Sequence, residues 1–208
     1  LCFGFISSVK QLGDLIAASS VLKGRARVLI VGGVPEREIG AEQYTKAMIA
    51  AGATPAFRDV VYIHPKFVSD RVRDALHAVA TAAVSTRKAE SESGAIVMAL
   101  RFGLPVVMRS GGASIFGPDD ALTFVDVPSL TAALENVVTS PASREMLSAR
   151  SRALADTFTW DRAAKAHLDW IGWGDSYERD GVHEPGGLES QIDAALALAV
   201  QPPSAWPT

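Results

Sequence analysis

The sequence predicts an α/β fold, a Rossmann-like parallel sheet with helices on both faces, followed by C-terminal helices. Short apolar runs alternate with stretches of helical periodicity through the first 125 residues. Several of these runs are continuously apolar, as in strands that a parallel sheet buries on both faces. From Ser129 onward only helical patterns follow, which places the additional helices after the sheet.

The expected strands are short and end in polar or glycine-containing loops. They cover residues 1–6, 28–31, 59–63, 80–84, 104–108 and 122–125. Ligands of such sheets bind at the carboxyl ends of the strands. We therefore expect a site where the loops after Ile6, Val31, Ile63 and Val84 meet.

The expected helices follow the spacing of apolar residues and the capping residues beside them. They cover residues 12–22, 41–51, 70–79, 95–102, 129–138, 141–156 and 163–170, and a final apolar stretch at 192–200 can form one more. Ser69 or Asp70 caps the helix at 70–79, and Thr159 or Asp161 caps the helix at 163–170. We predict one domain over residues 1–172 and a tail over 173–208, with Trp160 and Trp170 packed in the core.

Composition narrows the classes of function. The 208 residues are 48% hydrophobic with a formal charge of −3, so no basic surface for nucleic acid is indicated. No apolar run reaches the length of a membrane span, and no signal peptide is recognisable. The single cysteine, Cys2, fits a reducing compartment, and we expect a cytoplasmic protein. Because the chain begins at Leu1 without a methionine, we expect it to be a piece of a longer protein.

The most informative stretch is residues 87–107. A polar loop of small residues opens an apolar helix, Gly103 ends that helix, and a buried strand follows. A helix that begins at Ser93 and Gly94 offers free N–H groups and the positive end of its dipole, which suits phosphate. An ordinary capped helix explains the same pattern and stays an open alternative.

The order of these features resembles the C-terminal, nucleotide-sugar-binding half of GT-B glycosyltransferases, especially the large retaining family 4. The matching segments are 3–10, 28–32, 91–107 and 156–170, spread over roughly 170 positions. In the family, the first segment corresponds to the opening strand with its phosphate-binding lysine, and the second to the next strand with a glycine turn. The third corresponds to the donor-phosphate loop with its helix and strand. The fourth corresponds to a C-terminal helix with the pattern F-[ST]-W.

Two residues depart from the family pattern. The family often has arginine directly after the first glycine, where this chain has Phe5. The family also has two glutamates eight residues apart on the donor loop and helix. Glu90 fits the first, but Met98 stands at the second and cannot hold the ribose hydroxyls as a carboxylate does. The nearby Glu92 is an alternative for the first glutamate.

The resemblance implies a set of site residues. Glu90 is the candidate catalytic residue, and the candidate substrate-binding residues are Gly4, Lys10, His64, Arg87, Ser91, Glu92, Ser93 and Gly94. The positive charge of a lysine and of a helix start attracts a diphosphate, and a carboxylate accepts hydrogen bonds from sugar or ribose hydroxyls. Solvated side chains and an acidic helix start remain the structural alternatives. No metal site is expected, because His77 and His167 lie on predicted helices without a second histidine at i+4.

The resemblance also implies a function. We expect the donor-binding half of a hexosyl-type glycosyltransferase that uses a nucleotide-diphosphate sugar without a further cofactor. The acceptor site belongs to a missing N-terminal domain, so this chain alone is expected to bind nucleotide weakly and to transfer no sugar. Peripheral membrane association through that domain stays open. The alternatives are an interaction or scaffold domain that kept the fold, motivated by Phe5 and Met98, and half of a sugar-nucleotide epimerase.

Overall fold

The computed structural model describes residues 1–87, 93–111, 115–117 and 119–171. By their contacts the residues form two units, Leu1–Phe158 and a second unit that begins at Thr159. Each unit is described by itself. The predicted tail, with its expected helix at 192–200, lies outside the described residues, and the domain boundary after residue 172 stays a prediction.

The first unit is built on parallel strands. Strands β1 (Cys2–Phe3), β2 (Val28–Val31) and β3 (Val61–His64) pair in the order β1-β2-β3. Strands β4 (Ala83–Ser85), β5 (Val106–Arg109) and β6 (Leu122–Phe124) pair in the order β4-β5-β6. In the two halves Val28 lies opposite Val61 and Val107 opposite Leu122.

Two hydrogen bonds join the halves between β1 and β4. The Val84 N–H donates to the Leu1 carbonyl at 2.8 Å, and the Leu1 amino group donates to the Ala82 carbonyl at 2.8 Å. The spatial order across the sheet is therefore β3-β2-β1-β4-β5-β6, as in a Rossmann fold. The predicted fold class is confirmed, and the strand order reverses direction at the β1–β4 junction.

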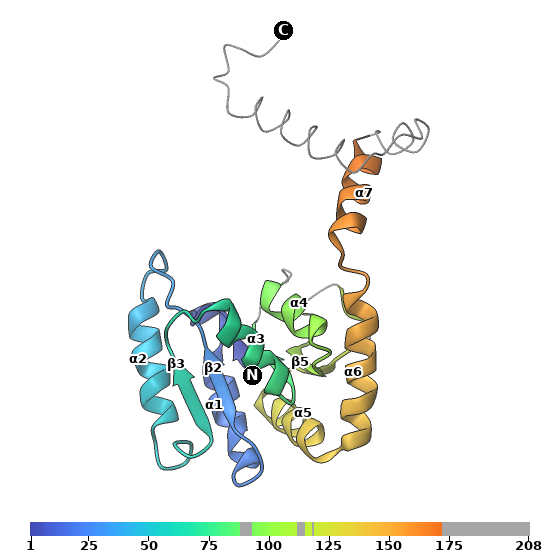
Figure 1. Cartoon of the computed structure of the whole chain (residues 1–208). Helices are drawn as coiled ribbons and strands as arrows, with labels where there is room; N and C mark the ends of the chain where they lie inside the picture. The colour runs from blue at the N-terminus through green and yellow to red at the C-terminus, as the bar shows by residue number, and fades with distance from the viewer. Residues whose placement is uncertain (88–92, 112–114, 118, 172–208) are drawn as a thin grey trace, which may run out of the picture. The chain divides into compact units, whose positions relative to one another are not determined.

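Helices connect the strands and cover the sheet. They are α1 (Leu12–Ala18), α2 (Ala41–Gly52), α3 (Asp70–Val79), α4 (Gly94–Arg101), α5 (Val127–Thr139) and α6 (Pro141–Ala155), with 3-10 turns η1 (Ser8–Lys10) and η2 (Ser19–Leu22) around α1. Figure 1 shows β2 and β3 side by side in one half and β5 among α4, α5 and α6 in the other. Helix α1 packs against α2 and α5, and α4 packs against α6.

Capping residues set several helix starts, of which the cap at Ser69 was expected. The Ser69 side chain accepts a hydrogen bond from the Val72 N–H at the start of α3. A reciprocal capping box between Asp126 and Ser129 starts α5. Gly103 follows α4 with a φ of +64°, a left-handed conformation that glycine adopts without strain and that ends the helix.

The core consists of the apolar faces that the sequence pattern indicated. Ile6, Leu12, Leu15, Ile30 and Leu130 are at most 1% exposed and belong to one cluster between the sheet and its helices. Burying one such side chain contributes roughly 1.5–3 kcal/mol to folding. This cluster fixes the positions from which the loops at the carboxyl edge project.

Two strands differ most from their predicted lengths. The first strand was expected over residues 1–6, but β1 ends at Phe3 because Gly4 turns the chain with a φ of +96°. The segment still follows β2, since the N–H groups of Gly4 and Ile6 donate to Val31 and Gly33. Strand β4 begins at Ala83 and not at residue 80, because Ala80 still serves as the C-cap of α3.

The second unit contains α7 (Trp160–Trp170) among its described residues. The Thr159 side chain accepts from the Arg162 N–H, which confirms the predicted cap. The predicted core packing of Trp160 and Trp170 is wrong, because the two residues are 89% and 86% exposed. An amphipathic spacing shows which side of a helix is apolar but not what covers it. Among the described residues no helix combines the length and hydropathy needed to cross a membrane.

Gly32 provides a test of the contact between the ends of β1 and β2. A Cβ at Gly32 would lie 2.1 Å from the Gly4 carbonyl oxygen, so Gly32→Ala forces the two segments apart. We expect it to lower the free energy of unfolding by at least roughly 1–3 kcal/mol, the usual cost of overpacking.

Gly13 in α1 is the matched control, because a Cβ there meets nothing within 4 Å. Gly13→Ala is expected to be neutral or to stabilise by up to about 1 kcal/mol. Urea denaturation of both variants measures the difference. Equal stability of Gly32→Ala and wild type would contradict the described contact.

Candidate functional site

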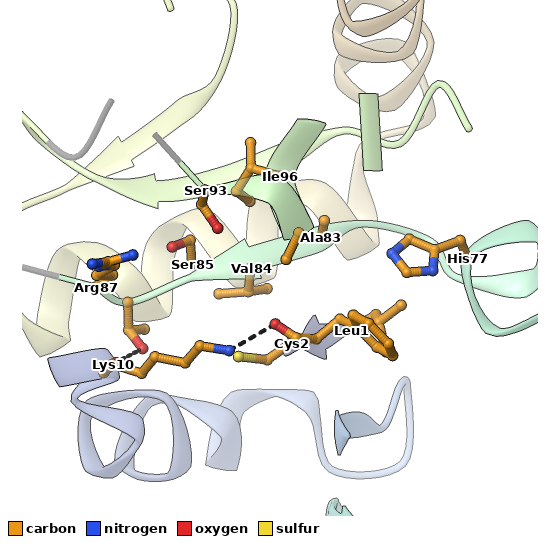
Figure 2. Close-up of a pocket in the computed structure, with 13 residues that line it drawn as sticks. Leu1, Cys2, Lys10, His77, Ala83, Val84, Ser85, Arg87, Ser93 and Ile96 are labelled. Atoms are coloured by element: carbon orange, nitrogen blue, oxygen red, sulfur yellow. Dashed lines mark hydrogen bonds between the residues drawn. The ribbon is translucent and has the colours of Figure 1, made fainter. Parts of the chain in front are cut away.

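A small cavity lies at the carboxyl edge of the sheet where β1 and β4 meet. Its volume is about 20 Å³, and its polar lining comes mainly from Lys10, Ser85, Thr86, Arg87 and Ser93. Figure 2 shows the Lys10 side chain running along one side of β4, with Ser85 and Ser93 on the other side. Segments from both halves of the sheet therefore contribute to one site, at the place where ligands of this architecture bind.

Lys10 is the central cation of this cavity. The turn η1 directs its side chain back along β1, and Nζ donates to the Phe3 carbonyl at 2.7 Å. The Thr86 hydroxyl donates to the Lys10 carbonyl and so ties η1 to the end of β4. A Cβ on Gly4 would lie 3.0 Å from Lys10 Nζ, so the glycine keeps this space open. The predicted residues Lys10 and Gly4 are thus in contact.

A second cation, Arg87, lines the same cavity. Its Nε is buried and has no hydrogen-bond partner among the residues that the structure describes. Burial lowers the pKa of Lys10, and the like charge of Arg87 lowers it further. Within the described residues no carboxylate forms an ion pair with either side chain. The cavity therefore holds positive charge that those residues do not neutralise.

The N-terminus of α4 faces the same place. Ser93 occupies the N-cap position, for which the sequence had left a serine or a glutamate open, and its side chain makes no capping hydrogen bond. Ile96 and Val97 donate their N–H groups to the Ser93 carbonyl. In the described part of the chain this leaves the N–H groups of Gly94 and Ala95 at the free end of the helix. A Cβ on Gly94 would meet no described residue within 4 Å, so the described part of the chain leaves this helix start open.

Other predicted site residues lie elsewhere. His64 is exposed at the end of β3, does not line the cavity, and accepts from the Gly32 N–H through its carbonyl at 3.1 Å. Met98 is half-buried on α4 and also stands outside the cavity lining. Glu90, Ser91 and Glu92 lie outside the described residues, so their predicted roles stay predictions.

Arg109 at the end of β5 was not predicted and supports this edge of the sheet. Its guanidinium donates to the Val125 carbonyl at 2.8 Å and to the Thr86 carbonyl at 3.4 Å, and it pairs with Asp14 of α1. It also lies over the Phe124 ring, 4.9 Å from the ring centre. The sequence signal that could have identified Arg109 is its position as a charged residue at the end of a buried apolar strand.

This arrangement suits an anion more than a cation. Lys10, Arg87, the N-terminus of α4 and the serines Ser85 and Ser93 all contribute to the lining of this cavity. A volume of about 20 Å³ has room for one water molecule, so a larger ligand binds at the mouth or displaces the Lys10–Phe3 bond. In the described part of the chain no cluster of three metal-ligating side chains occurs.

The buried ammonium of Lys10 gives a pH test of this geometry. Its pKa in the folded protein lies below the ordinary 10.5, so just below that pH the unfolded chain binds more protons than the folded one. The free energy of unfolding then rises with pH in this range and levels off above 10.5. Lys10→Met removes this contribution.

We expect the stability of wild type relative to Lys10→Met to increase as the pH approaches 10.5 from below. Urea denaturation of both proteins at a series of pH values measures this difference. A difference that stays constant, or that falls with pH, would show that the ammonium is not buried.

No protein-family model and no curated protein matches the sequence. The structure is similar to the C-terminal domain of a glycosyl transferase group 1 family protein, LpcC, from Francisella tularensis, with 15% identity, a TM-score of 0.61 and coverage of 75% of this chain and 83% of that one.

Two larger proteins are similar over a part of their length. HepE from Anabaena, solved in complex with UDP-glucose, matches at 18% identity and a TM-score of 0.64 over 75% of this chain and 44% of its own. Sucrose-phosphate synthase from Thermosynechococcus elongatus matches at 16% identity and a TM-score of 0.66 over 86% of this chain and 45% of its own. The chain thus spans less than half the length of these two proteins.

The identities of these three proteins to the chain lie between 15% and 18%. At such low identity these likenesses establish the architecture of the domain. The chain has the Rossmann-like fold of the C-terminal domains of GT-B glycosyltransferases.

Proposed function

We propose that this domain binds the nucleotide-diphosphate part of a sugar donor and forms the donor-binding half of a hexosyl-type glycosyltransferase. The observation that carries the proposal is the convergence of Lys10, Arg87 and the open start of α4 on one cavity at the β1–β4 junction. HepE, which has a similar fold, was solved with UDP and with UDP-glucose.

The chemistry of transfer gives these groups a role. When the bond between the sugar and the diphosphate breaks, negative charge grows on the leaving phosphate. An ammonium has three N–H donors, and the Phe3 carbonyl accepts from Lys10, which leaves donors for a phosphate oxygen. Arg87 and the dipole of α4 add positive potential at the same place. Fixed charges of this kind stabilise the developing anion without reorganisation.

The remaining parts of the proposal follow the resemblance. Glu90 faces the donor sugar as the catalytic residue, and Ser91, Glu92, Ser93 and Gly94 hold the phosphates and neighbouring hydroxyls. The His64 segment approaches the nucleobase. A further domain supplies the acceptor, so the 208-residue chain binds donor without transferring sugar. No metal ion or other cofactor is required, because side-chain cations and the helix N-terminus oppose the diphosphate charge. A cytoplasmic location belongs to this proposal.

A second candidate function is a domain that kept the fold and serves as an interaction or scaffold module. The small cavity and the bond between Lys10 and its own strand favour this alternative. Phe5 and Met98, at positions where the family has charged residues, point the same way. Nucleotide binding distinguishes the two candidates, because a scaffold has no reason to retain it.

Calorimetric titration with UDP, GDP and ADP tests the proposal. We expect one of them to bind the chain at millimolar concentration or better, and Lys10→Ala to weaken binding by roughly 10- to 150-fold, since a hydrogen bond to a charged group contributes about 1.5–3 kcal/mol. Lys46→Ala is the control, because Lys46 is an exposed lysine of α2 that pairs with Glu42. Absence of heat with all three nucleotides would favour the scaffold function.

Gly94→Ala separates ligand contact from folding. The structure has space for the added methyl, and alanine favours a helix, so the variant is expected to be at least as stable as wild type. A phosphate seated on the start of α4 would collide with the methyl, which costs roughly 1–3 kcal/mol of binding free energy. Thermal unfolding and nucleotide titration measure the two effects. Unchanged nucleotide affinity would show that the phosphate does not approach this helix.

A further inference from the structure

Gln11, the residue directly after Lys10, has an unusual backbone conformation. Its φ is +48° and its ψ is +47°, and among the described residues it is the only non-glycine residue with a positive φ. In this left-handed region the Cβ atom lies too close to the backbone, so a residue other than glycine is strained there. Strained residues persist where the surrounding structure holds them, and they concentrate at functional sites. The strain at Gln11 therefore points to a role for the turn that it forms.

The strained turn sets the direction of the Lys10 side chain. Gln11 joins the end of η1 to the start of α1, and its N–H donates to the Ser8 carbonyl at 3.1 Å. A residue at a helix start is usually extended and caps the helix, but Gln11 makes no capping bond within the described part of the chain. Lys10 is the last residue of η1, and from there its ammonium reaches back to the Phe3 carbonyl at 2.7 Å. Helix capping therefore does not account for the left-handed residue, whereas the placement of Lys10 does.

Two hydroxyl groups hold the peptide groups on either side of Gln11. The Thr86 hydroxyl donates to the Lys10 carbonyl, which belongs to the peptide group before Gln11. The Leu12 N–H, which belongs to the peptide group after it, donates to the Tyr44 hydroxyl of α2 at 2.8 Å. The rotations of these two planar groups define φ and ψ of Gln11, so the two bonds together fix both angles. Thr86 and Leu12 are at most 1% exposed, so loss of either bond leaves a polar group without its partner.

We propose that Thr86 and Tyr44 are positioning residues, which hold Gln11 in its strained conformation and thereby keep Lys10 directed at the diphosphate of the donor. This inference rests on the proposed function, because it names the groups that prepare that same site for its ligand. Without the two bonds the strained turn relaxes and Lys10 leaves the cavity for solvent. Binding must then order this long side chain again, which lowers the affinity.

The test removes one hydroxyl at a time and keeps the shape of the side chain. Thr86→Val and Tyr44→Phe break the two bonds, and Thr86→Ser retains a hydroxyl at the first position. Thr45→Val is the matched control for the threonine, because Thr45 is 4% exposed and its hydroxyl has no partner among the described residues. Tyr62→Phe is the control for the tyrosine, because Tyr62 is an exposed residue of β3. Thermal unfolding shows which variants are folded, and since the two hydroxyls are tested independently, one folded variant is sufficient.

The first measurement follows the Lys10 amine without any ligand. Acetylation by acetic anhydride at a series of pH values, read at Lys10 by mass spectrometry, reports the pKa of this amine. In the wild type, burial lowers that pKa below 10.5, and the other titratable groups that line the cavity are Cys2, His77, Arg87 and the Leu1 amino group. No variant changes these groups. We therefore expect the midpoint to rise toward 10.5 in the two variants that lose a bond, and to stay in place in the serine variant and in both controls. An unchanged midpoint in both of those variants would overturn this inference, whether or not nucleotide binds.

The second measurement is calorimetric titration of the full chain with UDP, GDP and ADP. We expect Thr86→Val and Tyr44→Phe to weaken nucleotide binding roughly 2- to 13-fold, the range that ordering one long side chain costs. In a Lys10→Ala background neither change is expected to add a loss, because the side chain that they position is absent. Unchanged affinity, or a loss that persists in this background, would overturn the inference and leave the proposed function standing. A wild type that binds no nucleotide while the pH midpoint moves as expected would overturn the proposed function and leave the hold on Lys10 standing.

Discussion

The pairing of β1 with β4 is the interaction on which the site depends. It joins two segments separated by 81 positions in the chain and brings both halves of the sheet to one edge. The cavity takes Cys2, Phe3 and Lys10 from one side of this junction and Ser85 and Arg87 from the other. Two backbone hydrogen bonds contribute only about 0.5–1.5 kcal/mol each, so the surrounding buried side chains must hold the junction together.

Polar contacts extend this junction to the loops. Thr86 ties the end of β4 to Lys10, and Arg109 ties the ends of β5 and β6 to the same threonine. The guanidinium also pairs with Asp14, which fixes α1 against this edge. The segment that carries Lys10 and the end of β4 are therefore anchored on a connected network. Such anchoring keeps cationic groups in position before a ligand arrives, which limits the ordering that binding requires.

Much of the fold could be predicted from local patterns. The strand at Val28–Val31, the cap at Ser69 and the helix stop at Gly103 depend on neighbouring residues alone, and the structure has them where the sequence indicated. The proximity of Lys10 to the start of α4 followed from the rule that ligands gather at the carboxyl ends of parallel strands.

Other features depend on contacts between distant segments and left no local signal. Nothing near Lys10 in the sequence shows that its ammonium turns back to Phe3, or that Thr86 reaches its carbonyl. The Ser93 side chain was a good capping residue by type, yet it makes no capping bond. Trp160 is exposed although core packing was predicted, because the periodicity of apolar residues describes one helix and not the elements around it.

The uncapped start of α4 links ligand binding to the stability of the domain. Among the described residues no side chain caps the first amide hydrogens of this helix, and an anion resting there would serve as the cap that Ser93 does not supply. By mass action, any such anion that binds only the folded chain raises the midpoint of thermal denaturation, and the rise grows with the logarithm of the anion concentration once this exceeds Kd. The melting temperature of this domain is thus itself a sensor of what occupies the helix start.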